Sequence, residues 1–124
     1  MSDIRVFSLS VIAALTLAVV LPGHAFAASA AENFQRYCAQ CHGAEGRGDG
    51  VNATKDLPAA PKNLTNAEEL TRLTDERIAT IIANGGARNE LSSIMPPWGN
   101  TLTAQEIRDL VRFIRDLCKC TFKP

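Results

Sequence analysis

The sequence predicts an all-α domain, and three observations support this prediction. Apolar residues in the C-terminal third recur at spacings of three and four, as they do on one face of a helix. Helix-start signals precede such runs, including capping-box patterns at 65–68 and 103–106. Residues 28–124 have no convincing alternation of apolar and polar residues. Such an alternation would indicate a half-buried strand.

The first expected helix leads into a cysteine-containing turn. Its apolar face is formed by four residues at helical spacing, namely Ala30, Phe34, Tyr37 and Cys41. Four glycines between residues 43 and 50 then break regular structure. Pro58 and Pro61 keep the following stretch extended.

Two helices are expected in the middle of the chain. The capping-box pattern Thr65-Asn66-Ala67-Glu68 opens a short one. Thr74 caps a longer helix that ends at Asn84-Gly85-Gly86, where glycine suits a C-terminal cap. The inward-facing residues of this longer helix are Ile78, Ile81 and Ile82.

The last helix is expected to follow the capping box at 103–106. One face is apolar and is formed by Ile107, Leu110, Val111, Ile114 and Leu117. The opposite face is basic and carries Arg108, Arg112, Arg115 and Lys119. We interpret this basic face as a solvated surface, and a docking patch is the alternative.

The N-terminus has the features of a signal peptide covering residues 1–27. An uncharged apolar run from Val6 to Leu21 is broken by a proline and a glycine, and the small-x-small sequence Ala25-Phe26-Ala27 suits signal peptidase. Cleavage is expected after Ala27, with a second possible site at Ala28-Ser29-Ala30. The alternative is an uncleaved membrane anchor, because the apolar run approaches the lower length limit for a membrane span.

Residues 28–124 then form one small domain of 97 residues. The signal contains one acidic and one basic residue, so the mature chain keeps 12 Lys and Arg against 12 Asp and Glu. No nucleic-acid partner is expected, because nucleic-acid binding calls for a strongly basic surface. A domain of this size has a limited core and is often stabilised by a covalent link or a cofactor.

The run Cys38-Ala39-Gln40-Cys41-His42 is the attachment signature of a c-type haem. Each thiol can form a thioether to a haem vinyl group, and the adjoining histidine is placed to ligate the iron. A Cys-x-x-Cys pair alone is also typical of thioredoxin-like redox sites and of half a zinc site. The adjoining His42 favours one covalently bound haem c.

The second axial ligand of such a haem is usually Met or His. His24 and Met1 lie in the expected signal peptide, so the mature chain contains one histidine, His42, and one methionine, Met95. The alternative role of Met95 is to fill a gap in the core. Its setting between Ile94 and two prolines favours iron ligation, because the prolines stiffen the chain beside the thioether.

Two further cysteines, Cys118 and Cys120, lie near the C-terminus and would be exported into an oxidising compartment. An intramolecular disulfide is the first expectation. A disulfide to another molecule and the capture of a soft metal ion are the alternatives.

These motifs resemble class I cytochrome c along essentially the whole mature chain. The resemblance implies a small cytochrome c fold, in which the N- and C-terminal helices cross and short helices surround one covalent haem. Ala30 and Phe34 match the small and aromatic residues at the helix crossing, and Phe113 matches the aromatic residue of the partner helix. The sequence Leu117-Cys118-Lys119-Cys120 departs from the family pattern.

The resemblance also assigns roles to three loop residues. Pro61-Lys62-Asn63-Leu64 resembles the family's Pro-x-Asp/Asn-Leu segment, in which the proline carbonyl accepts a hydrogen bond from the haem-ligating histidine. Pro61 takes that role here, and Leu64 is expected to pack on the haem. Met95-Pro96-Pro97-Trp98-Gly99 resembles the loop that supplies the methionine ligand.

The function implied is periplasmic electron transfer through a haem ligated by His42 and Met95, with redox proteins in the periplasm or at the membrane surface as partners. Two strong axial ligands leave no open iron position, so the chain is expected to be a carrier and not an enzyme. One alternative is a haem enzyme or gas sensor in which Met95 dissociates. Another is a subunit through which electrons enter a larger oxidoreductase complex.

Overall fold

The computed structural model describes residues 28–124, and this part of the chain contains helices and no strands. The elements are α1 (Ala30–Tyr37), α2 (Ala39–His42), α3 (Ala67–Leu70), α4 (Asp75–Asn84), the 3-10 helix η1 (Ala87–Asn89) and α5 (Ala104–Cys118). The predicted all-α fold is therefore confirmed. The expected signal peptide, with its cleavage after Ala27 or its alternative role as an anchor, lies outside the described residues.

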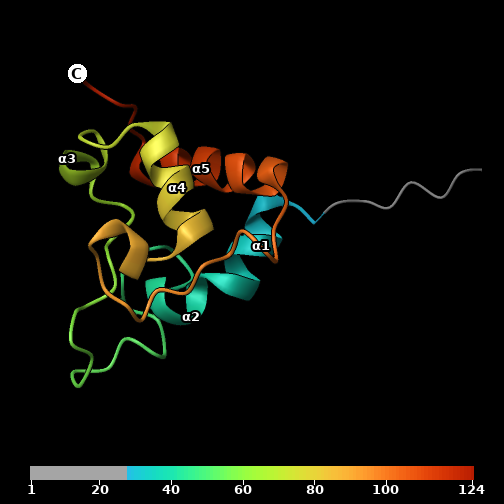
Figure 1. Cartoon of the computed structure of the whole chain (residues 1–124). Coiled ribbons are helices and arrows are strands. Elements are labelled where there is room, and N and C mark those ends of the chain that lie inside the picture. Colours follow the sequence, from blue (N-terminus) through green and yellow to red (C-terminus); the bar gives the residue numbers. More distant parts are fainter. Residues whose placement is uncertain (1–27) are drawn as a thin grey trace, which may run out of the picture.

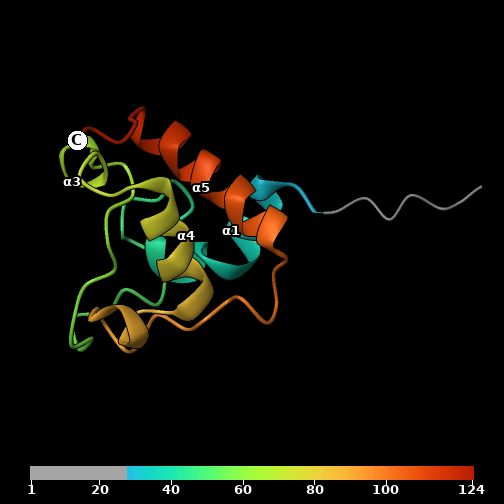
Figure 2. The same ribbon diagram turned by 45° about the horizontal axis from the view of Figure 1, so that its top comes forward.

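The N- and C-terminal helices of the domain pack against each other (Figures 1 and 2). Phe34 of α1 is fully buried, and its ring centroid lies 5.0 Å from that of Phe113 of α5. The two helices are also joined by a hydrogen bond that Asn33 Nδ2 donates to Glu106 Oε1 over 3.3 Å. The aromatic contact expected from the resemblance is thus present.

Both of these helices begin with a reciprocal capping box. The Thr103–Glu106 box of α5 is the one predicted from the sequence. The box at the start of α1 joins Ser29 and Glu32 and was not predicted, although Ser-x-x-Glu is a recognisable pattern. At α3 the predicted cap was wrong by one residue. The Asn66 side chain accepts the backbone N–H groups of Glu68 and Glu69, while the Thr65 hydroxyl donates to Asn63 Oδ1.

The core is formed where α1, α3 and α4 pack against α5. Thr74 caps α4 and Gly85 ends it, as predicted. Ile81 is only partly buried, in contrast to the expectation that it points inward with its two neighbours. The buried apolar residues of this core are Phe34, Leu70, Ile78, Ile82, Leu102, Ile107, Leu110, Val111, Ile114 and Cys118.

The C-terminal segment folds back beside α3 (Figures 1 and 2). Cys118 and Cys120 form the expected intramolecular disulfide, and the backbone N–H of Lys123 donates to Thr71 O over 2.8 Å. No helix among residues 28–124 is long and apolar enough to span a membrane.

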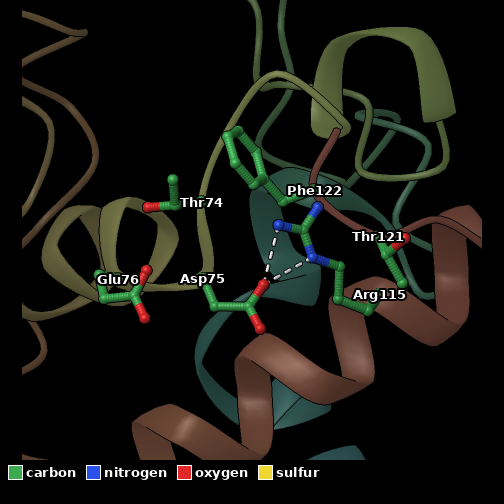
Figure 3. A pocket seen from close by; sticks show the side chains of 6 residues that line it. All are labelled: Thr74, Asp75, Glu76, Arg115, Thr121 and Phe122. Atoms are coloured by element: carbon green, nitrogen blue, oxygen red, sulfur yellow. Dashed lines mark hydrogen bonds and ion pairs between the residues drawn. The ribbon is translucent and has the colours of Figure 1, made fainter. Parts of the chain in front are cut away.

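Arg115 does not belong to a solvated basic face, and that part of the prediction was wrong. Its side chain is only 10% exposed. The guanidinium donates to the carbonyl oxygens of Leu70 and Leu73 over 2.7 and 2.5 Å and pairs with Asp75 (Figure 3). Arg115 therefore ties α5 to the end of α3 and the start of α4.

Candidate functional site

The two cysteines and the histidine of the attachment signature lie within one helical turn. Cys38 ends α1 and begins α2, and its carbonyl accepts the backbone N–H groups of Cys41 and His42 over 3.2 and 2.9 Å. Cys38 and Cys41 are free thiols and are partly buried. The helix geometry thus fixes the spacing between the two sulfur atoms and the imidazole.

The glycine-rich loop after α2 holds this turn in place. A helix end leaves carbonyl groups without partners. Here the carbonyls of Gln40, Cys41 and His42 accept backbone N–H groups from positions 52, 50 and 48, over 2.8, 3.1 and 2.7 Å. Gly43 starts the loop at φ 81°, and a Cβ atom there would overlap Oδ1 of Asp49.

The imidazole of His42 is oriented by a backbone carbonyl. Its Nδ1 lies 2.8 Å from the carbonyl oxygen of Lys62, so Nδ1 carries the proton and donates it. The prediction that Pro61 provides this carbonyl was wrong by one residue. The Pro61 oxygen lies against Gly48 instead, where a Cβ atom would come within 2.6 Å of it.

Burial shifts the pKa of the His42 imidazole and of the Cys38 thiol. It lowers the pKa of His42, although the hydrogen bond to Lys62 acts in the opposite direction. The imidazole is therefore neutral at neutral pH, and Nε2 keeps its lone pair for a metal ion. Burial, assisted by the neighbouring Cys41, raises the pKa of Cys38 to about 11, so this thiol stays protonated.

Met95 lies in a loop that is joined to the C-terminal end of α4 by backbone hydrogen bonds. Its carbonyl accepts the N–H of Gly86 over 2.9 Å. The N–H groups of Trp98 and Gly99 donate to Ile82 and Ala83 of α4 over 3.0 and 2.9 Å. Met95 is partly buried and contacts the hydrophobic core, so the loop holds its thioether at a defined place in the fold.

Two aromatic rings connect the cysteine turn to the methionine loop. The ring centroids of Tyr37 and Trp98 lie 5.1 Å apart with an angle of 49° between the planes. Tyr37 immediately precedes Cys38, and Trp98 follows Met95 by three residues. This contact was not predicted, because Tyr37 and Trp98 lie far apart in the sequence and no local pattern links them.

A buried asparagine anchors the start of the methionine loop. Asn89 is 5% exposed, and its side chain donates to Gly85 O over 2.7 Å and accepts from Arg77 Nη1 over 2.7 Å. No pattern in the sequence indicated this role for Asn89. The contact ties η1 to α4, and the segment that carries Met95 follows η1 in the chain.

Leu64 lies next to the glycine-rich loop. Its N–H donates to Gly46 O over 2.6 Å, and its side chain is partly buried against the core. The segment that carries Lys62 is thus held on both sides of the carbonyl that contacts His42. Whether Leu64 packs on a haem stays a prediction.

The residues present fit a haem c. The two thiols are not bonded to each other, and the Nδ1 of His42 is held by a carbonyl, which leaves Nε2 as its metal donor. A soft thioether is available from Met95 on a separate loop. With a haem c bound, this set would supply two covalent attachment points, one nitrogen ligand and one sulfur ligand.

Comparison with known proteins supports the same assignment. Residues 25–114 match the family described as cytochrome c oxidase, cbb3-type, subunit III. Among solved structures, the KustC0563 c-type cytochrome has a TM-score of 0.58 and 26% identity, covering 73% of this chain and 98% of that chain. No curated protein sequence matches the chain significantly.

A second similar structure belongs to a larger assembly, the Kuenenia stuttgartiensis reducing HAO-like protein complex Kustc0457/Kustc0458. It has a TM-score of 0.57 and 27% identity, covering 71% of this chain and 40% of that chain. The helical fold, the attachment turn and the match over most of the sequence agree. The chain therefore belongs to the family of cytochrome c oxidase, cbb3-type, subunit III, and is a class I c-type cytochrome.

Proposed function

We propose that this protein is a periplasmic electron carrier that uses one covalent haem c, with His42 and Met95 as its axial ligands. The observation that carries the proposal is the attachment turn itself. Cys38, Cys41 and His42 share one helical turn, and the Nδ1 of His42 is bonded to Lys62 O. The expected signal peptide supports export, because the family attaches haem outside the cytoplasm.

A bound haem c supplies an iron that changes between the ferrous and ferric states. The protein contributes the surroundings of that change. The Lys62 carbonyl fixes the plane of the His42 ring and raises its donor strength. The Met95 thioether would hold the iron as a soft sulfur ligand, which favours the ferrous state and raises the potential. With both ligands in place, the iron would have no open position for a substrate, and the chain would relay electrons.

A second candidate function is supported by the comparisons. The matching family is named for a subunit of an oxidase, and one similar structure belongs to a reducing HAO-like complex. The same domain here would then pass electrons into a larger oxidoreductase. Isolation of the native protein separates the two, since a free carrier elutes alone and a subunit elutes with its partners.

Haem attachment is tested by the mass of the mature protein. After expression with a cytochrome maturation system, the intact mass should exceed that of residues 28–124 by one haem, and the haem should survive acid-acetone extraction. A mass equal to that of the bare chain would overturn the proposal.

The ligand assignment is tested by Met95→Ala. This variant should keep its haem but lose the weak near-infrared band of methionine ligation, and the reduced protein should bind carbon monoxide. Its potential should fall by on the order of tenths of a volt, within the range of about 0.8 V that axial ligands cover. Ile94→Ala, at an exposed neighbouring residue, is the control and should leave all three properties unchanged.

The parent protein decides between carrier and gas sensor in the same experiment. Carbon monoxide should leave its reduced spectrum unchanged, because Met95 occupies the second axial position. Rapid binding of carbon monoxide by the parent would favour a haem enzyme or sensor. An unchanged near-infrared band in Met95→Ala would show that another group ligates the iron.

A further inference from the structure

The C-terminal disulfide lies apart from the haem attachment turn. Cys118 is the last residue of α5, and Cys120 follows it after one residue. Both views place the C-terminal segment beside α3 and away from α2 (Figures 1 and 2). Any chemistry of this pair is therefore separate from that of Cys38 and Cys41.

The two sulfur atoms differ in their access to solvent. Cys118 is 5% exposed and belongs to the hydrophobic core. Cys120 is only partly buried, and its neighbours Lys119 and Thr121 are exposed. A thiol reductant in solution therefore reaches Sγ of Cys120 more readily than Sγ of Cys118.

Cys120 is also surrounded by positive charge. Arg115 Nη1 lies 3.8 Å from its Sγ, and the groove around it is lined by three cations, Arg115, Lys119 and Lys123, and by one acid, Asp116. Asp75 of α4 offsets part of the Arg115 charge through its ion pair (Figure 3). The balance favours a negative charge on sulfur, because a neighbouring cation stabilises a thiolate.

We propose that Cys118 and Cys120 form a reversible dithiol–disulfide redox site that exchanges with dithiol reductants, and that Arg115 stabilises the thiolate of Cys120 in the reduced form. Two features make this disulfide reducible. One residue separates the cysteines, so the bond closes a small ring, and one of its sulfur atoms is accessible. Stabilising the reduced thiolate shifts the equilibrium further toward reduction.

The reaction is a two-electron thiol–disulfide exchange. A thiolate of the reductant attacks Sγ of Cys120, the sulfur–sulfur bond breaks, and its electron pair leaves on Cys118, which takes up a proton. The second thiolate of the dithiol, or a second glutathione thiolate in the glutathione mixtures, then attacks the reductant's sulfur atom in the mixed disulfide. Cys120 departs as a thiolate beside Arg115, and the reductant becomes a disulfide.

The test uses the haem-loaded protein equilibrated with mixtures of reduced and oxidised dithiothreitol and of reduced and oxidised glutathione. Free thiols are then alkylated and counted by mass, and trypsin cleavage after Lys119 separates the two cysteines for assignment. We expect both cysteines to become alkylated together and to re-form the disulfide when the oxidised reagent is in excess. A pair that stays oxidised throughout would overturn the proposal.

The role of Arg115 is tested with Arg115→Gln, and Arg108→Gln on the exposed face of α5 is the matched control. At a pH above the Cys120 thiol pKa of both proteins, loss of the cation should lower the equilibrium constant for reduction about tenfold if it raises that pKa by about one unit. The control should match the parent. Equal constants in all three proteins would overturn the role of Arg115.

A second measurement does not depend on the folding of that variant. In the reduced parent protein, the rate of alkylation of Cys120 by iodoacetamide should rise with a midpoint pH below the ordinary thiol value of about 8.5. A midpoint at or above that value would contradict stabilisation of the thiolate. The haem spectrum is recorded in parallel and tests the proposed electron-carrier function separately. Either proposal can therefore fail without the other.

Discussion

Gly43 ends α2 with φ 81° and ψ 154°, a backbone conformation that essentially only glycine adopts without strain. The loop that follows returns three N–H groups to the carbonyls of the attachment turn. The position of His42 therefore depends on a residue that has no side chain.

Gly43→Ala should destabilise the protein by about 1–3 kcal/mol, because of the backbone strain and the overlap of its Cβ with Asp49. Denaturant unfolding of the haem-loaded protein measures this change. Ala44→Ser, at the exposed neighbouring position, is the control and should differ from the parent by about 0.5 kcal/mol or less. Equal stability of the parent and Gly43→Ala would show that the loop relaxes.

The correction from Pro61 to Lys62 illustrates the limit of sequence reasoning for single residues. The motif located the segment that supplies a carbonyl to His42, and the structure selected which carbonyl. The sequence pattern is the same whether the carbonyl of Pro61 or that of Lys62 contacts His42. The choice depends on Gly46 and Gly48, which position the segment by close contact and by the hydrogen bond from Leu64.

At the scale of elements, the capping boxes at Ser29 and Thr103 start the two helices that cross. The hydrogen bonds that Thr103 and Asn33 donate to Glu106 lower the pKa of its carboxyl below the ordinary value of 4.5. Such a group stabilises the folded state fully above its ordinary pKa. That contribution is lost as the pH falls through the folded pKa.

Glu106→Gln should therefore lower stability at neutral pH, and the difference from the parent should shrink at acid pH. The expected cost at neutral pH is of the size of one helix cap, because the variant loses the carboxylate acceptor. Thermal unfolding at several pH values compares the two proteins, with Glu90→Gln outside the helices as the control. A difference that is constant across the pH range would contradict the capping role.

The helix crossing itself depends on Phe34, which is fully buried against Phe113. Phe34→Ala should cost about 3–5 kcal/mol through lost burial and a residual cavity. Phe122→Ala removes an aromatic ring that is 41% exposed and should cost much less. Similar losses in the two variants, measured by denaturant unfolding, would show that the crossing is not the centre of the core.

At the scale of the whole molecule, residues 38–42 of the attachment turn and 94–99 of the methionine loop contain no Lys, Arg, Asp or Glu. Gln40, Ile94 and Pro96 are exposed, with Ile94 41% exposed, and Ala39 is partly buried. We expect partners to dock on these residues through a small apolar contact with modest electrostatic steering.

The rate at which membranes of the source cells oxidise or reduce the protein should therefore change little with ionic strength. Ile94→Lys should slow that rate, whereas Arg108→Gln on α5 should not. A rate that falls steeply with salt, together with a slow Arg108→Gln variant, would identify the basic face of α5 as the docking surface instead.

The sequence by itself determined the helical class, the longer helices and the attachment turn, because each depends on neighbours within about one helical turn. Within the expected mature chain, residues 28–124, it also left His42 and Met95 as the only histidine and methionine available as iron ligands. The Tyr37–Trp98 contact, the Asn89 anchor and the burial of Arg115 were decided by the tertiary structure alone. Each joins segments whose approach depends on how α1, α4 and α5 pack, and no local pattern records that approach.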